Sequence, residues 1–289
     1  MEIRTPAKIN LSLRVVGKRR DGYHLLDTIM VPVSLYDEIE IRKIRPTSEK
    51  KKAADGLIRV TCDDPLVPGG EKNIAYRAAR LVMRWARSEQ PVHIHIRKQI
   101  PVGAGLGGGS TDAAATLIGL NRLLRLRLSA AKLEKMALSV GADVPFFIRA
   151  RPARARGIGE RLYPIRKLAR FWLVIVYPGF PVSTARVFNN YRSTLTKSPV
   201  NTTIVASLKS FDKLPGLLFN DLESVTFGCY PRLSLIKARL LHEGAAGGLM
   251  SGSGSSVFGV FASKRQAARA LRRLRKEEGA TAFLVHALS

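Results

Sequence analysis

The chain has 289 residues and carries 48 lysines and arginines against 22 aspartates and glutamates, which gives a formal net charge of +26. Hydrophobic residues make up 46% of it, and no run of them approaches the roughly 20 residues of a membrane span. Only two cysteines are present, Cys62 and Cys229. This composition excludes a membrane protein and a disulfide-rich secreted one, and it predicts a cytoplasmic globular protein with room for two domains.

Strand patterns dominate the first hundred residues. Alternating apolar and polar residues predict strands, and apolar residues three or four apart predict helices. Because the first strand pattern begins at residue 3, we expect no signal or transit peptide. The predicted elements are strands over 3–16, 25–44 (bounded by Pro32), 57–63 and 92–100, a helix over 73–87, a turn over 17–24 and a charged loop over 46–56.

The rest of the chain mixes helices and strands. A helix is expected from Ser129, which suits its N-terminal cap, to Val140, where Gly141 ends it, and Pro145 forbids its continuation. Residues 193–215 show no clear pattern, so nothing is predicted for them. The further predicted elements are strands over 171–177 and 281–288, helices over 183–191, 231–243 and 264–278, and a glycine-serine loop running into a strand within 245–262.

A glycine-rich stretch lies between the predicted strand ending at 100 and an alanine-rich helix. Glycine allows positive φ and lets backbone N–H groups approach a ligand closely. The unpaired N–H groups and dipole of the following helix favour an anion, so this stretch predicts a phosphate site with Asp112 in the first helical turn. Its residues are Pro101, Val102, Gly103, Ala104, Gly105, Leu106, Gly107, Gly108, Gly109, Ser110 and Thr111.

Other glycine-loop classes fit this stretch less well. Residues 103–108 match GxGxxG, but residues 121–128 offer no acidic side chain for a ribose, as a dinucleotide-binding fold requires. A Walker A loop is excluded because no Gly-Lys-Ser/Thr follows. A flexible linker would not be flanked by a patterned strand and helix.

The high positive charge raises nucleic-acid binding as an alternative. Basic residues are spread along the chain, however, and the densest groups are Lys50–Lys52 in a loop and residues 265–276 on an amphipathic helix. Few aromatic residues lie among them, so no stacking platform is predicted. We therefore interpret the charge as a solvated basic surface and expect no membrane partner.

Five separated motifs carry residues typical of chemistry. They are Pro-Ala-Lys-Ile-Asn at 6–10, Asp-Gly-Tyr-His at 21–24, the glycine loop, Gly-Ala-Asp-Val-Pro at 141–145 and Gly-Ser-Gly-Ser at 252–255. In order and spacing, the chain resembles the GHMP kinase superfamily of galactokinase, homoserine kinase and mevalonate kinase. The motifs span most of the chain, and Thr111 stands where the family usually has a second serine.

The resemblance implies an α+β fold of two domains, over 1–153 and 154–289, with a boundary near residues 151–156. The first would be the ATP-binding domain, like domain 2 of ribosomal protein S5, and the second would be ferredoxin-like. It also implies an ATP-dependent kinase of isoprene biosynthesis, acting on the 2-hydroxyl of a cytidine diphosphate conjugate of methylerythritol. Magnesium would arrive with ATP, without a dedicated protein site.

The resemblance further implies roles for individual residues. Lys8 and Asp143 match the catalytic positions, whereas without it Lys8 would be an exposed strand residue and Asp143 a turn or capping residue. Phe188, on a helix, would otherwise be core. The implied substrate-binding residues are Asn10, Tyr23, His24, Thr184 and Phe188, and the third motif, beside the active site, is Gly252, Ser253, Gly254 and Ser255. A kinase for another small alcohol and a basic nucleic-acid-binding protein remain the alternatives.

Overall fold

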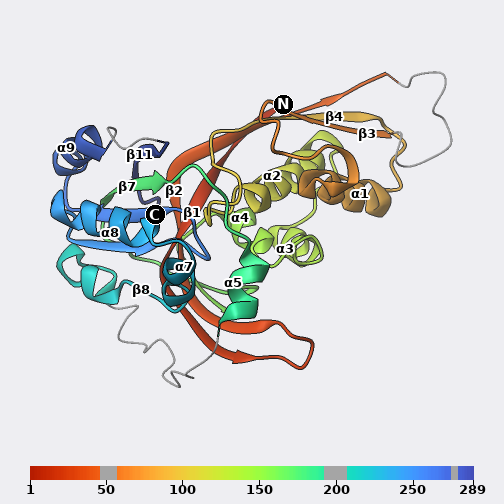
Figure 1. The fold of residues 1–289 in the computed structure, drawn as a ribbon. Coiled ribbons are helices and arrows are strands. Elements are labelled where there is room, and N and C mark those ends of the chain that lie inside the picture. The colour runs from red at the N-terminus through yellow and green to blue at the C-terminus, as the bar shows by residue number, and fades with distance from the viewer. Residues whose placement is uncertain (46–56, 192–206, 275–278) are drawn as a thin grey trace. The chain divides into compact units, whose positions relative to one another are not determined.

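The computed structural model describes residues 1–45, 57–191, 207–274 and 279–289 (Figure 1). The chain divides into two compact units. Unit 1 comprises residues 1–7, 36–102 and 107–150, and unit 2 comprises residues 8–35, 103–106 and 151–289. Two long strands, β1 (Glu2–Lys18) and β2 (His24–Lys43), contribute residues to both units.

The sheet of unit 1 is built on the second half of β2. There β2 pairs antiparallel with β4 (Val92–Arg97), and β4 pairs parallel with β3 (Ile58–Cys62). Along β4 the isoleucines are buried while His93 and His95 are only half-buried, which is the alternation expected of a sheet with one covered face.

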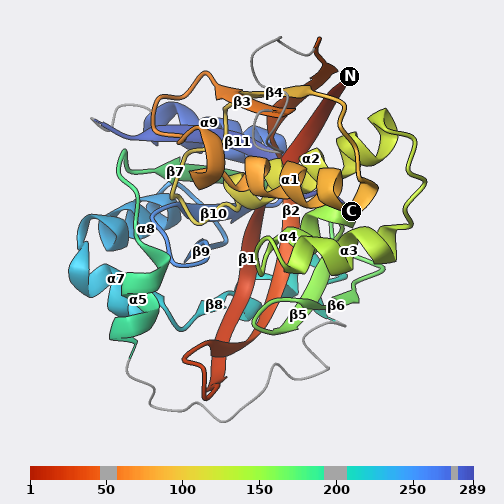
Figure 2. The same cartoon turned by 90° about the vertical axis from the view of Figure 1, so that its right-hand side faces the viewer.

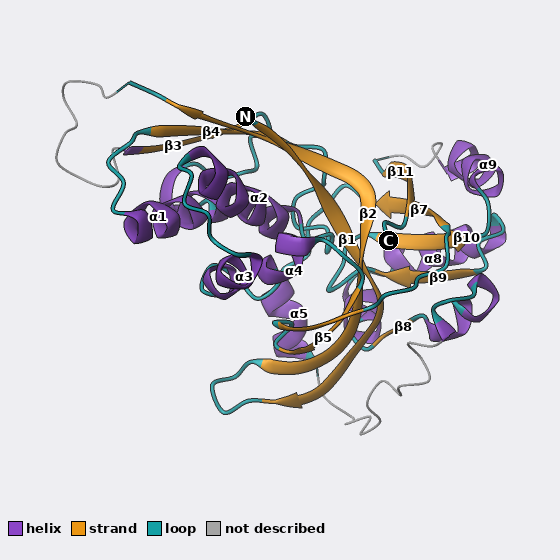
Figure 3. Ribbon diagram, turned by 180° about the vertical axis from the view of Figure 1, so that it is seen from behind, coloured by secondary structure: helices purple, strands orange, loops and turns teal. Residues whose placement is uncertain are grey.

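Helices cover that apolar face. Helices α1 (Ile74–Ala86) and α2 (Gly108–Leu123) lie side by side against the strands (Figures 1 and 3). Gly119 allows α2 to approach β2 closely, because a Cβ there would lie 2.4 Å from Ile41 Cδ1. Helices α3 (Ala130–Leu138) and α4 (Val144–Arg149) pack on α2 in turn.

Unit 2 contains an antiparallel sheet of four strands in the order β11-β7-β10-β9 (Figure 2). Helix α8 (Arg232–His242) packs against β9 and β10, and helix α9 (Lys264–Leu274) packs against β7, β10 and β11. The buried sides of both helices complete an apolar core with these strands. The strands are β7 (Trp172–Tyr177), β9 (Gly247–Met250), β10 (Val257–Phe261) and β11 (Thr281–His286).

The remaining elements of unit 2 border its parts of β1 and β2. The first half of β2 pairs antiparallel with β5 (Ala153–Gly157), which pairs with β6 (Arg161–Pro164). Strand β1 pairs in parallel with the two-residue strand β8 (Phe219–Asn220). Helices α5 (Thr184–Asn190) and α7 (Glu223–Cys229) lie near each other, and short 3₁₀ turns occur at 70–72, 211–213 and 215–217.

Most predicted elements are confirmed, including the strands that became β1, β3, β7 and β11 and the helices that became α1, α3, α5, α8 and α9. Ser129 caps α3 as expected, accepting a hydrogen bond from the N–H of Lys132. The charged loop at 46–56 lies outside the described residues. Within the parts of the chain that are described, no helix is both long and apolar enough to span a bilayer.

One of the two proline predictions was wrong. Pro32 does not bound a strand, because β2 continues through it. It lies between the stretch paired with β5, residues 26–30, and the stretch paired with β4, residues 38–43, so neither pairing needs its missing N–H. The expectation that Pro145 prevents continuation of the helix from Ser129 is confirmed, because α3 ends at Leu138. Pro145 lies in the first turn of a new helix, α4, where the missing N–H costs nothing.

The start of α2 also differs from the prediction. The helix begins at Gly108 with Gly107 as its N-cap, so Ser110 and Thr111 lie inside the first turn and Asp112 lies beyond it. Glycine at a positive φ caps the helix here in place of a hydroxyl side chain. Strands β5, β6, β8 and β9 and helices α4 and α7 were not predicted, because each is short and carries too few residues to show a period.

Candidate active site

The first half of the glycine loop, residues 103–106 of unit 2, is held by its backbone. Gly103 and Gly105 have φ values of +65° and +75°, in the region that favours glycine. A Cβ at Gly105 would lie 2.1 Å from the carbonyl oxygen of Ser251, so no side chain fits there. The N–H of Val182 donates to the Gly103 carbonyl at 3.0 Å, and the N–H of Ser256 donates to the Ala104 carbonyl at 3.1 Å.

The second half of the loop begins α2 in unit 1. Gly107 has a φ of +75°, and no side chain caps the first turn, so its N–H groups are available to an anion. Ser110 is half-buried at this end of the helix. Thr111 is fully buried, with its hydroxyl hydrogen-bonded to the hydroxyl of Thr5. Of the two hydroxyl residues, Ser110 is therefore the one with solvent-accessible surface.

The third motif, residues 252–255, joins the glycine loop within unit 2. Ser251, just before it, donates its hydroxyl to the Gly105 carbonyl at 2.9 Å, and Ser255 donates to the Phe180 carbonyl. The hydroxyls of Ser253 and Thr184 are 2.8 Å apart. The structure thus brings together three of the predicted segments.

Two residues that sequence reasoning missed, Asn220 and Thr226, hold the backbone of this motif through side-chain hydrogen bonds. The Asn220 side-chain amide donates to the carbonyls of Met250 and Gly252, both at 2.8 Å, while its oxygen accepts from the N–H of Leu222. The Thr226 hydroxyl donates to the Ser253 carbonyl at 3.3 Å. Neither residue belongs to a recognisable motif, and only the fold reveals what they do.

Lys8 is buried on β1, with 4% of its surface exposed. Its ammonium donates to the Asn10 side-chain oxygen at 2.6 Å, and the Asn10 amide donates to the Thr28 hydroxyl at 2.8 Å. Its backbone N–H donates to the Leu106 carbonyl, and a Cβ on Gly252 would lie 3.3 Å from its Nζ. An ordinary exposed strand residue is excluded, because this buried ammonium lies among the glycine loop and the third motif.

Asp143 belongs to unit 1, where it precedes α4 in a half-buried position. Its side chain makes no capping hydrogen bond to that helix. Asp143 therefore occupies a turn at the N-cap position of α4 without capping the helix through its side chain, and its role in catalysis stays a prediction.

An aromatic cluster lies in unit 2. The rings of His24 and Phe188 are stacked with centroids 5.1 Å apart, and Tyr191 meets His24 edge-on at 6.4 Å. Burial, with the nearby charge of Lys18, lowers the pKa of His24, so its imidazole is neutral at neutral pH. Tyr23 is 59% exposed. The cluster brings two predicted residues together and adds Tyr191, which sequence reasoning missed.

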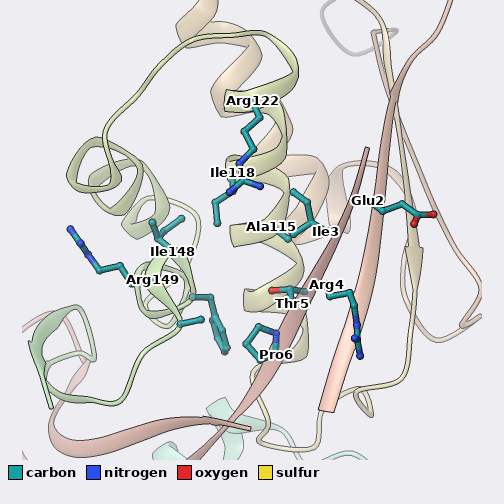
Figure 4. A pocket seen from close by; sticks show the side chains of 12 residues that line it. Glu2, Ile3, Arg4, Thr5, Pro6, Ala115, Ile118, Arg122, Ile148 and Arg149 are labelled. Atoms are coloured by element: carbon teal, nitrogen blue, oxygen red, sulfur yellow. The ribbon is translucent and has the colours of Figure 1, made fainter. Parts of the chain in front are cut away.

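A cavity of about 400 Å³ opens in unit 1 between the start of β1, α2 and α4 (Figure 4). Arg4, Arg122 and Arg149 are among its lining residues. Arg149 is paired with Glu134 at 2.5 Å, and Arg4 lies 3.8 Å from Glu38. None of the predicted site residues lines this cavity.

Comparisons with known proteins identify the family of this chain. The family model described as GHMP kinases N terminal domain matches residues 73–151, and the one described as GHMP kinases C terminal matches residues 203–280. The chain is 47% identical to the 4-diphosphocytidyl-2-C-methyl-D-erythritol kinase of Geobacter sp. (strain M21), over 96% of each chain. It is also 47% identical to the kinase of that name from Syntrophotalea carbinolica, over 97% of this chain and 96% of the relative.

Solved structures match along the whole length. A crystal structure of 4-(cytidine 5'-diphospho)-2C-methyl-D-erythritol kinase superposes with a TM-score of 0.81 at 36% identity, covering 100% of both chains. Homoserine kinase from Cytophaga hutchinsonii shares the fold at 20% identity, with a TM-score of 0.75 over 98% of this chain and 94% of that one. The predicted α+β, two-domain GHMP kinase fold is confirmed. The chain belongs to the 4-diphosphocytidyl-2-C-methyl-D-erythritol kinase family of GHMP kinases.

Proposed function

We propose that the chain uses ATP to phosphorylate the 2-hydroxyl of 4-diphosphocytidyl-2-C-methyl-D-erythritol, in the non-mevalonate route to isoprenoid precursors. The substrate rests on the 47% identity, over 96% of the chain, to relatives named for that reaction. The chemistry rests on one observation of the structure, the buried ammonium of Lys8 beside Asn10 and the backbone of Gly252.

In this proposal the loop at 101–111 cradles the phosphates of ATP. Its positive-φ glycines and the uncapped start of α2 present N–H groups without side chains in the way. Magnesium, arriving with ATP, would neutralise part of the charge of the phosphates. In the described part of the chain, no group of three or more His, Cys, Asp or Glu side chains could hold a metal ion.

Asp143 and Lys8 carry the transfer itself. Asp143 accepts the proton of the substrate's 2-hydroxyl while the oxygen of that hydroxyl bonds to the γ-phosphorus of ATP. ADP leaves with the electrons of the broken P–O bond. Lys8 stabilises the charge that develops on the transferred phosphoryl group. The bond from Lys8 to Asn10 orients that ammonium before the substrates arrive.

The substrate is held by Asn10, Tyr23, His24, Thr184 and Phe188. The neutral imidazole of His24 and the ring of Phe188 offer a flat aromatic surface to the cytosine. The hydroxyl of Thr184 is 2.8 Å from the hydroxyl of Ser253 in the third motif. This position supports a contact between Thr184 and the sugar alcohol or its diphosphate.

The proposal also covers the domain organisation and the cellular location. The chain is divided functionally into an ATP-binding domain over 1–153 and a second domain over 154–289. The protein acts in the cytoplasm, in keeping with Cys62 and Cys229, which are both free thiols.

An assay of ADP release with a panel of alcohols tests the proposed reaction. We expect turnover with 4-diphosphocytidyl-2-C-methyl-D-erythritol and little with mevalonate or homoserine. The Asp143→Asn variant keeps the shape of the side chain but removes the base, so kcat should fall by about 10²–10⁴-fold with nucleotide affinity unchanged. Asp212→Asn, at an exposed position of unit 2, is the matched control and should be unaffected.

Each other outcome points to a different alternative. Preferred turnover of another alcohol would place the chain among kinases of a different substrate. Salt-sensitive binding of RNA at physiological ionic strength, without ATP turnover, would instead favour the nucleic-acid alternative. Normal turnover by Asp143→Asn would remove this residue from the mechanism.

A further inference from the structure

Three ionisable side chains meet inside unit 1 beneath the start of α2. The ammonium of Lys98 donates to Asp112 at 2.7 Å and also to Asp37. All three side chains are buried, with exposed fractions of 4% for Lys98, 3% for Asp112 and 0% for Asp37. With both carboxylates ionised, this cluster would hold a net charge of −1 out of contact with water, which is costly.

The two carboxylates are not equivalent. Asp37 accepts two backbone N–H groups on its other oxygen, from Gln99 at 2.7 Å and Ile100 at 2.8 Å. Asp112 has no hydrogen-bond partner on its Oδ1 atom, although this atom is buried. Hydrogen bonds from N–H groups stabilise an ionised carboxylate, so Asp37 is built to hold the charge and Asp112 is not.

The surroundings of Asp112 also favour its protonated form. Burial raises the pKa of Asp112 to about 8, and the charge of Asp37 adds to this although Lys98 opposes it. Burial alone would lower the pKa of Lys98, but Asp112 and Asp37 raise it above its usual value. Lys98 therefore stays charged while Asp112 holds a proton at neutral pH.

Few other groups can alter this balance. On β3, the pKa of the Cys62 thiol is raised by burial and by Asp63 and Asp112, against the opposing effects of the Asp64 N–H and Lys98. Asp63 accepts the backbone N–H of Lys98 at 2.8 Å. The buried faces of α1, α3 and α4, which pack on α2, carry one titratable group, the phenol of Tyr76.

The cluster adjoins the proposed phosphate cradle. A Cβ on Gly108, the first residue of α2, would lie 2.9 Å from the Nζ atom of Lys98. Asp112 lies about one turn further along the same helix. Any negative charge that appears on Asp112 is therefore close to the N–H groups that attract phosphate, in surroundings that screen it poorly.

We propose that Asp112 is a positioning residue whose proton keeps the cluster of Asp37, Lys98 and Asp112 neutral overall, and that the nucleotide binds more tightly to this protonated form. The inference rests on the proposed nucleotide site at 101–111. It assigns to the enzyme a proton linkage in which nucleotide binding takes up a proton from solvent whenever Asp112 is ionised beforehand.

The proposed linkage makes nucleotide affinity depend on pH. Below about pH 8 Asp112 already holds its proton, so nucleotide affinity is independent of this group. Above about pH 8 the free enzyme loses the proton, and the bound polyphosphate favours its return. Affinity then falls as pH rises, by at most about tenfold per pH unit, until the bound form loses the proton too.

Isothermal titration calorimetry of the full chain with ADP and magnesium tests this linkage. Titrations at about pH 8.5, in buffers of different ionisation enthalpy, give the number of protons taken up on binding, at a pH where the nucleotide itself is fully ionised. We expect the wild type to take up a substantial fraction of one proton. Asp112→Asn imitates the neutral carboxyl, so it should take up almost none and bind with an affinity that does not change between about pH 7 and 9.

Other results overturn the inference. Nucleotide binding by the wild type without proton uptake, or equal uptake by Asp112→Asn, contradicts it and leaves the proposed kinase function standing. The absence of nucleotide binding at either pH overturns both. If Asp112→Asn does not fold, infrared spectroscopy of the wild type decides. A buried carboxylic-acid band should be present at neutral pH and lost above about pH 8, and its absence at neutral pH contradicts the proposal.

Discussion

Single glycines determine whether the glycine loop can form. Gly105 has a φ of +75°, and a Cβ added there would lie only 2.1 Å from the carbonyl oxygen of Ser251. Any other residue at this position would therefore both strain the backbone and clash with that oxygen. Gly244 has a φ of +89°, but a Cβ added there would have no atom within 4 Å, so a substitution would strain the backbone without a clash. The two positions therefore separate the two effects.

Replacing each glycine with alanine tests this difference. Both variants should lose about 1 kcal/mol of unfolding free energy from the positive φ. Gly105→Ala should lose about 1–3 kcal/mol more, because the Ser251 backbone must move, and its KM for ATP should rise. Chemical denaturation measures the first quantity and steady-state kinetics the second. Equal losses in the two variants would show that the close approach is not important.

Sequence reasoning at this scale found the residues but not all of their contacts. Lys8, Asn10 and the glycines lie in contiguous motifs, which the family resemblance made recognisable. The proton-holding cluster of Asp37, Lys98 and Asp112 draws on three distant segments, and no local pattern links them. The hydroxyl of Thr111 likewise meets Thr5 only because β1 lies beside α2 within unit 1.

At the scale of elements, the third motif depends on the short strand β8. Asn220 of this strand binds two carbonyls of the turn at 250–252 and is 6% exposed. Because a loop without ladder pairing needs such bonds to keep one shape, we expect Asn220 to control the position of Gly252 relative to Lys8.

Asn220→Asp removes both donors while keeping the shape of the side chain. It leaves two carbonyls unpaired and turns an oxygen towards them, which should destabilise unit 2 by about 1–3 kcal/mol or more. We also expect kcat to fall, since Lys8 would lose its neighbouring backbone. Asn190→Asp, on the exposed end of α5, serves as the control. Normal kcat in a folded Asn220→Asp variant would mean that the motif keeps its shape without this residue.

The elements themselves were mostly predictable, since periodicity is strong in long segments such as β1 and α1. The prediction failed where tertiary context decides. Pro32 is tolerated in β2 because of how the strand pairs. Strand β8, with two residues, exists only through its pairing with β1.

At the scale of the whole molecule, the charge of +26 is the dominant property. On α9 the buried face holds alanine and leucine while basic residues point outward, so its charge is solvated. A field of this sign attracts both ATP and a diphosphate substrate, which speeds encounter without any contact.

The dependence of the kinetics on salt tests that effect. Between low and physiological ionic strength, kcat/KM for either anionic substrate should fall several-fold, while kcat, which reports on the bound complex, should change little. An uncharged additive at equal osmolarity is the control. A kcat/KM that does not respond to salt would show that the charge serves another purpose.

The most direct test of the central claim is the identity of the phosphorylated hydroxyl. Carbon 2 of a 2-C-methyl sugar alcohol bears no hydrogen, so a phosphate on its oxygen has no three-bond coupling to a proton there. Proton-coupled ³¹P NMR of the reaction with ATP should show a new monoester singlet, formed in step with ADP. A monoester signal split by a carbinol proton, or ADP formation without any new monoester, would contradict the account.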